Sequence, residues 1–233
     1  MFVRSILVCA AVLGLSLMSA ASAMGDDVII PSWRGDAGTT YQEWLFGTSA
    51  DPAAPDVVTN GYGSPTADIS IGWAGSGWWD QFPPTAAGRL GVWDLGRGVD
   101  AENPELFGGI TISVPNSSFS GLGTYTDVWV QVTYYVDINL APTVNVTGAT
   151  ELPGGMVQLL ETVPGWGSWF LSQSMWRIEP NTLNSTIVIT GHDMGSLIDH
   201  VVVDTMSVPE PASMLLLGLG AAALGIRRKR SGR

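Results

Sequence analysis

The residues from Thr126 to Ile138 constrain the fold of this chain more than any other stretch, because apolar side chains occupy every second position. A period of two is that of a β-strand, whose side chains point alternately to opposite faces of a sheet. One face of this strand would carry Val128, Val130, Val132, Tyr134 and Val136. The other face would carry Asp127, Trp129, Gln131, Thr133, Tyr135 and Asp137. Residues 24–207 contain no comparable helical stripe with capping residues, so we expect β-structure throughout.

Short runs of β-branched and aromatic residues recur along the chain, separated by Gly, Pro, Asn and Asp. Strands are predicted at Tyr41–Phe46, Ala67–Trp73, Arg89–Asp94, Gly109–Val114, Thr126–Ile138, Thr143–Thr147, Gly155–Thr162, Trp169–Ile178, Ser185–Thr190 and Ile198–Val203. So many strands in one domain predict an all-β fold, an antiparallel β-sandwich of the jelly-roll kind. The run Leu197–Asp204 also resembles the closing strand of galactose-binding-like jelly rolls.

The N-terminal residues 1–23 have the organisation of a secretory signal peptide. Arg4 supplies the positive charge, Ile6–Met18 the apolar segment, and Ala21-Ser22-Ala23 the small residues before a cleavage site. We expect a signal helix here and cleavage after Ala23. The only cysteine, Cys9, lies inside this segment, so the exported domain, residues 24–207, would be held by its core and not by disulfides.

The C-terminal residues 208–233 combine three features in a fixed order. Pro209-Glu210-Pro211 follows Val208 and favours an extended backbone. An uncharged, apolar run of 15 residues, 212–226, comes next and predicts a single, short membrane helix. It ends at a basic stop, Arg227-Arg228-Lys229-Arg230, within the tail 227–233; such a cluster stays on the cytoplasmic side.

This order of motif, apolar run and basic cluster resembles the PEP-CTERM sorting signal of exported Gram-negative proteins. The resemblance implies that an exosortase, a membrane-embedded cysteine protease, reads Pro209, Glu210 and Pro211 and removes the tail. It further implies a link with exopolysaccharide or biofilm formation. The alternative is an ordinary C-terminal membrane anchor that is never cut.

The charge of the expected mature domain is strongly negative. Of the 21 acidic residues only Glu210 lies outside residues 24–207, and of the ten basic residues only Arg34, Arg89, Arg97 and Arg177 lie inside. The domain therefore carries a charge near −16 and no lysine. Binding to nucleic acid, which depends on clustered cations, is not expected.

Ten tryptophans all fall within residues 24–207, and two groups of them lie in glycine-rich contexts. Exposed indoles at these sites would stack on sugar rings, and the candidates are Trp78, Trp79, Trp166 and Trp169. The alternative for each is that the indole fills the core of the sandwich.

The acidic turn Asp94–Asp100, followed by Glu102 and Glu105, offers several oxygen ligands for calcium. Arg97 in its middle favours a solvated turn instead. Only two histidines, His192 and His200, are present, and no Gly-x-Ser-x-Gly motif ties either to a nucleophilic serine. We therefore expect a non-catalytic protein with no required cofactor.

Together these features predict an exported protein that is held briefly in the membrane by its C-terminal helix and then reaches the cell surface or the extracellular matrix. Its expected partners are an exosortase and an extracellular polysaccharide. A carbohydrate-binding jelly-roll module is the alternative function, and a secreted hydrolase is a third.

Overall fold

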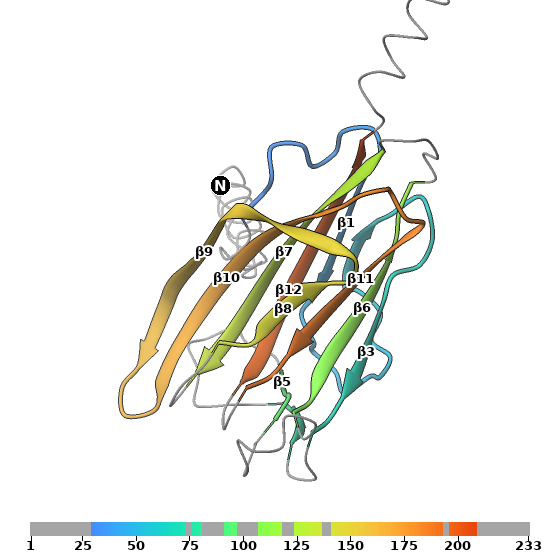
Figure 1. Cartoon of the computed structure of the whole chain (residues 1–233). Helices are drawn as coiled ribbons and strands as arrows, with labels where there is room; N and C mark the ends of the chain where they lie inside the picture. The colour runs from blue at the N-terminus through green and yellow to red at the C-terminus, as the bar shows by residue number, and fades with distance from the viewer. Residues whose placement is uncertain are drawn as a thin grey trace, which may run out of the picture.

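The computed structural model describes residues 29–72, 76–80, 91–96, 107–117, 124–136, 141–192 and 196–208 (Figure 1). All regular secondary structure in these residues is β-strand, as predicted. None of them forms a helix long and apolar enough to cross a membrane. The expected signal helix at 1–23 and membrane helix at 212–226 lie outside the described residues.

Twelve strands are present in the described residues. They are β1 (Thr39–Trp44), β2 (Val57–Thr59), β3 (Thr66–Ser70), β4 (Gly77–Trp79), β5 (Val92–Asp94), β6 (Gly109–Pro115), β7 (Tyr125–Val136), β8 (Thr143–Val146), β9 (Ala149–Val163), β10 (Gly167–Ile178), β11 (Asn184–Thr190) and β12 (Leu197–Val208).

These strands form two antiparallel sheets. The larger, eight-stranded sheet has the order β2-β1-β12-β7-β10-β9, and the smaller, four-stranded sheet has the order β3-β6-β11-β8. The short strands β5 and β4 extend the larger sheet beside the beginning of β12, along the same edge of β12 that pairs with β1. From β5 onward the chain passes repeatedly between the sheets, and only β9 and β10 are a hairpin within one sheet.

Each of the ten predicted strands overlaps an observed one, but the bounds differ. The three-residue strands β2 and β4 were not predicted, because so short a segment shows no period. Strand β9 begins six residues earlier than expected and includes Pro153 and Gly154. Strand β12 continues five residues beyond the predicted Val203, to Val208, which pairs with Tyr125.

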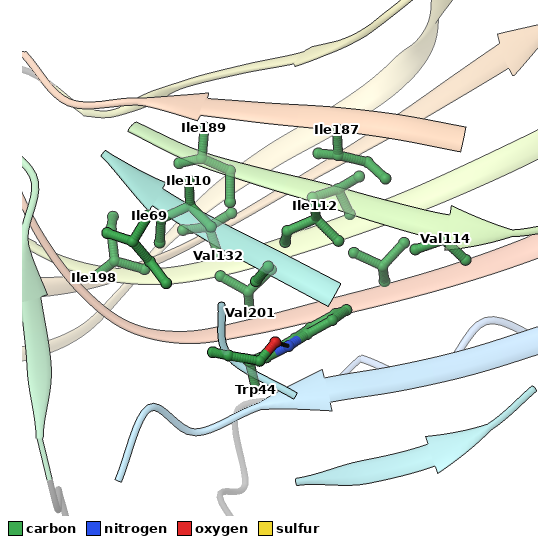
Figure 2. Packing of buried hydrophobic residues seen from close by; sticks show 14 of the residues in the cluster. Trp44, Ile69, Ile110, Ile112, Val114, Val132, Ile187, Ile189, Ile198 and Val201 are labelled. Carbon is green, nitrogen blue, oxygen red and sulfur yellow. Dashed lines mark hydrogen bonds between the residues drawn. The ribbon is translucent and has the colours of Figure 1, made fainter. Parts of the chain in front are cut away.

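The core lies between the two sheets and consists of branched aliphatic side chains. The smaller sheet contributes alternate isoleucines from β6 and β11, as its buried–exposed alternation requires. The larger sheet contributes the predicted valine face of β7 together with Ile198, Val201 and Val203 of β12. Figure 2 shows Ile110, Ile112, Ile187 and Ile189 facing this layer. Each such side chain stabilises the fold by about 1.5–3 kcal/mol through its burial.

The outer face of the larger sheet is also buried around β12 and β7, although many of its residues are polar. Glu43, Asp127, Thr133, His200 and Asp204 are each less than a tenth exposed. Part of the cover is the chain before β1. Ile29 exchanges two hydrogen bonds with the side chain of Gln131, its N–H donating to Oε1 at 2.6 Å and its carbonyl oxygen accepting from Nε2 at 3.1 Å.

Candidate functional site

The proposed sorting residues come directly after β12, a central strand of the larger sheet. Val208, the last residue of β12, pairs with Tyr125 of β7, and Met206 pairs with Thr39 of β1. Pro209, Glu210 and Pro211, the basic cluster 227–230 and the expected cleavage site at Ala23 lie outside the described residues. The folded domain thus reaches to within one residue of the motif.

Two of the four candidate tryptophans present their rings to solvent. Trp166 lies in the turn between β9 and β10 and is 58% exposed. The turn is held by a hydrogen bond that the Trp166 N–H donates to the carbonyl oxygen of Val163. It also requires Gly165, whose φ of 80° an L side chain rarely adopts. Trp79, at the end of β4, is 42% exposed.

The other two candidates take part in packing. The Trp78 ring packs against the core, and its Nε1 donates a hydrogen bond of 2.8 Å to the carbonyl oxygen of Phe46. Gly91 makes room for this ring, because a Cβ at that position would lie 2.8 Å from Nε1. Trp169 is fully buried and packs against Tyr135, with 5.2 Å between the ring centroids. In this conformation Trp169 offers no face for stacking, and Trp78 is only partly exposed.

Both exposed indoles lie at the same end of the larger sheet. A single row of paired residues joins Trp169, Tyr135, Leu197, Asp94 and Gly77, from β10 across to β4. At about 4.8 Å per strand, the row separates β10 from β4 by about 19 Å. A ligand that contacted both indoles would therefore span several sugar units.

A chain of polar side chains lies on the outer face, between β1 and β12. The Tyr41 hydroxyl donates a hydrogen bond to Glu43 Oε2, and Nε2 of His200 lies 2.8 Å from Glu43 Oε1. The His200 imidazole lowers the pKa of Glu43, with help from Tyr41 and against the effect of burial. Burial and the Glu43 carboxylate raise the pKa of Tyr41. Glu43 and His200 are both buried, so they contact each other and are not accessible to a substrate at the surface.

Two arginines neutralise buried aspartates on the same face, with the same geometry. Arg34 donates from Nε and Nη2 to both carboxylate oxygens of Asp204, at 2.6 and 2.7 Å, and lies over the ring of Tyr41. Arg177 does the same for Asp127, at 2.7 and 2.9 Å, over the ring of Tyr125. Burial raises the pKa of Asp204, and the Arg34 guanidinium acts in the opposite direction.

These pairs were not identified from the sequence. Each joins residues far apart in the chain, 170 positions for Arg34 and Asp204 and 50 for Arg177 and Asp127. A local hint was present, since Tyr41 and Glu43 are two residues apart and must share a face of one strand. Both described arginines form ion pairs with aspartates of the same domain. The described surface therefore carries acidic residues and no unpaired arginine or lysine.

The proposed calcium loop is only partly within the described residues. Asp94 is buried, and its Oδ1 accepts a hydrogen bond from the N–H of Gly96 at 3.2 Å. Asp100, Glu102 and Glu105 lie outside the described residues. Within the ranges that the structure covers, no group of three or more His, Cys, Asp or Glu residues is placed to hold a metal ion. Calcium binding stays a prediction.

An open groove lies where the two sheets diverge, between β8 and β9. It measures about 690 Å³ and is open to solvent. Its walls include Val144 of β8, Leu152 and Val157 of β9, and Ser174 and Trp176 of β10.

A family model of the PEP-CTERM protein-sorting motif matches residues 207–230. The match covers the proposed motif, the apolar run and the basic cluster, and it confirms the resemblance seen in the sequence. The chain therefore carries a PEP-CTERM sorting motif, which implies export and sorting by an exosortase. No curated protein and no solved structure shows significant similarity to the chain.

Replacing Arg34 by Met should destabilise the domain by about 3–5 kcal/mol, because the fully buried Asp204 would lose its counter-charge. Arg177→Met should cost less, about 1.5–3 kcal/mol, since the side chain of Arg177 is 34% exposed, against 17% for Arg34. Urea unfolding of the exported protein, followed by tryptophan fluorescence, measures both. No loss for Arg34→Met would show that the buried pair is not a major element of stability, and equal losses for the two variants would contradict the ranking by burial.

The variant Glu43→Gln tests the polar chain through its pH dependence. Because its pKa is lowered in the folded state, Glu43 adds stability that is present above the usual value of 4.5 and is lost as the pH falls through the folded value. The difference in unfolding free energy between wild type and Glu43→Gln should therefore shrink below about pH 4.5. The variant Thr111→Ala, which changes no titratable group, should differ from wild type by the same amount at each pH. A constant difference for Glu43→Gln would contradict the assignment.

Proposed function

We propose that this protein is an exported, non-catalytic β-sandwich protein that an exosortase processes at Pro209-Glu210-Pro211 and that then acts at the cell surface or in the extracellular matrix. The observation that carries the proposal is the PEP-CTERM motif at residues 207–230. The chain would enter the export pathway through the signal peptide 1–23 and remain anchored by the helix 212–226 until the tail is cut. The Arg227–Arg230 cluster would keep the C-terminal end of the anchor on the cytoplasmic side of the membrane.

A structural or adhesive role, linked to exopolysaccharide or biofilm, agrees with the character of the domain. Its ionic groups on the outer face are buried and mutually paired, which suits a stable scaffold better than a catalytic site. Its acidic surface favours solubility outside the cell. The repeated passage of the chain between the two sheets supports a jelly-roll arrangement.

Carbohydrate binding is the second candidate function, and the exposure of Trp79 and Trp166 favours it. Indoles that stand in solvent at one end of a sandwich offer flat apolar faces to sugar rings. The separation of about 19 Å between β4 and β10 suits an extended polysaccharide better than a single sugar.

The sorting proposal is tested by the double variant Glu210→Ala/Pro211→Ala. We expect this variant to keep its C-terminal tail and to stay in the membrane fraction, because the protease loses its recognition motif. Intact-mass measurement of membrane and external fractions decides between the two forms. Ser213→Ala, a small change in the neighbouring apolar run, should be processed like wild type. External wild-type protein that still carries Arg230 would overturn the proposal.

Carbohydrate binding is tested by affinity electrophoresis in gels that contain the exopolysaccharide of the producing cells. Trp166→Ala should weaken the retardation of the exported protein about two- to tenfold, as expected for the loss of one aromatic stacking contact. Leu183→Ala is the matched control, because it removes a similarly exposed apolar side chain, 67% exposed, outside the sheet end. Wild-type migration that is unaffected by the polysaccharide would exclude this function.

A further inference from the structure

β9 is the outermost strand of the larger sheet, and one of its edges pairs with no strand of the described residues. Within the described residues β9 pairs only with β10, and it lies at the margin of the sheet in Figure 1. The N–H and C=O groups along such an edge are a template for pairing with another strand. At 15 residues, β9 is the longest strand in the described part of the chain.

The middle of β9 also exposes large apolar side chains. Met156 is 42%, Val157 62% and Leu159 54% exposed. No charged residue lies between Glu151 and Glu161. Natural edge strands are commonly protected from pairing by lysine, proline or a bulge.

Bulges lie on both sides of Met156–Leu159 in β9. Near the beginning, the bulge around Pro153–Gly155 interrupts the pairing with β10. After the end, Pro164 starts the turn to β10. A second bulge, at Leu160, lies between the pairs Leu159–Phe170 and Glu161–Trp169. Between the two bulges, Met156–Leu159 has no proline, no lysine and no bulge.

The apolar residues of this segment continue the core face of the sheet. Leu159 pairs with Phe170, and Val157 pairs with Ser172. Directly opposed residues of antiparallel strands point to the same face, and Phe170 packs against the core, so Leu159 and Val157 share the core-facing side. The smaller sheet ends at β8, and Val157 lines the open groove beside it, with Leu159 next on the same side of β9.

We propose that β9 pairs in antiparallel fashion with β9 of a second copy of this chain, around a two-fold axis at Gln158. In this register Val157 of each copy lies opposite Leu159 of the other, and the two Gln158 side chains meet on the outer face. Gly155 and Leu160 belong to the two bulges, so the ladder between the copies is centred on Val157–Leu159 and carries no carboxylate. Registers moved by two residues leave only one apolar pair, Val157 with Val157 or Leu159 with Leu159, and set the other apolar residue against a bulge.

The uncharged, self-complementary pattern is what selects a second copy as the partner. The described cations are both paired within the domain, and Met156–Leu160 carries no charge that would favour an acidic or a basic protein. A two-fold, isologous contact is also the commonest symmetry of protein dimers. Its limited size places it among the weaker interfaces, below about 1,200 Å².

A cysteine at position 158 tests the register in the exported protein. In a Cys9→Ala background, Gln158→Cys should form a disulfide-linked dimer under mild oxidation, visible on a non-reducing gel. The two Cα atoms would lie about 4.5–5.5 Å apart, within the range that a disulfide spans. Thr111→Cys, on an exposed position of β6, should stay monomeric. Absence of the Gln158→Cys dimer, or equal cross-linking of both variants, would overturn the proposal.

Sedimentation velocity of the wild-type exported protein, at concentrations up to about 100 µM, should show a monomer–dimer equilibrium. Leu159→Lys should weaken the dimer at least tenfold, because it brings cations to the apolar junction. Val58→Lys places the same charge on β2, a strand at the opposite margin, where Val58 is 49% exposed, and should leave the dimer intact. A wild type that stays monomeric, or a Leu159→Lys variant as dimeric as wild type, would contradict the pairing.

Discussion

The structure depends on the pairing of β12 with β1 on one side and β7 on the other. This strand contributes Ile198, Val201 and Val203 to the core between the sheets. Its other face carries His200 and Asp204, which meet Glu43 and Arg34. The strand therefore joins the two sheets through apolar packing and also binds the segment before β1 through ionic contacts.

The two arginine–aspartate pairs explain how a lysine-free and strongly acidic domain tolerates buried carboxylates. Taking one carboxylate from water costs several kcal/mol unless a partner and hydrogen bonds compensate. The bidentate guanidinium supplies both, and the tyrosine ring beneath it excludes water from one side. The two described arginines thus have internal roles, and the described surface remains acidic.

Local sequence patterns predicted the strands, because the period of two and the Gly and Pro breaks act over a few residues. The sorting motif was recognisable for the same reason, since its three parts are contiguous. The Arg34–Asp204 pair and the Glu43–His200 contact depend on how distant strands align, which no local pattern encodes. The burial of Trp169 also depends on β7, where Tyr135 lies beside it. Trp166 and Trp169 lie in the same glycine-rich stretch of sequence, yet the Trp166 ring is exposed and the Trp169 ring is buried.

The direction of β12 has a consequence for how the domain would stand on the cell. On the proposed sorting route, only Pro209–Pro211 separate Val208 from the lipid-embedded segment, a reach of no more than about 14 Å. Strand β12 runs about 40 Å from that end to Leu197, whose row of paired residues lies beside the turn that holds Trp166. Before release, the Val208 end of the sandwich would therefore be held close to the bilayer, and the tryptophan-bearing end would lie at the far end of β12.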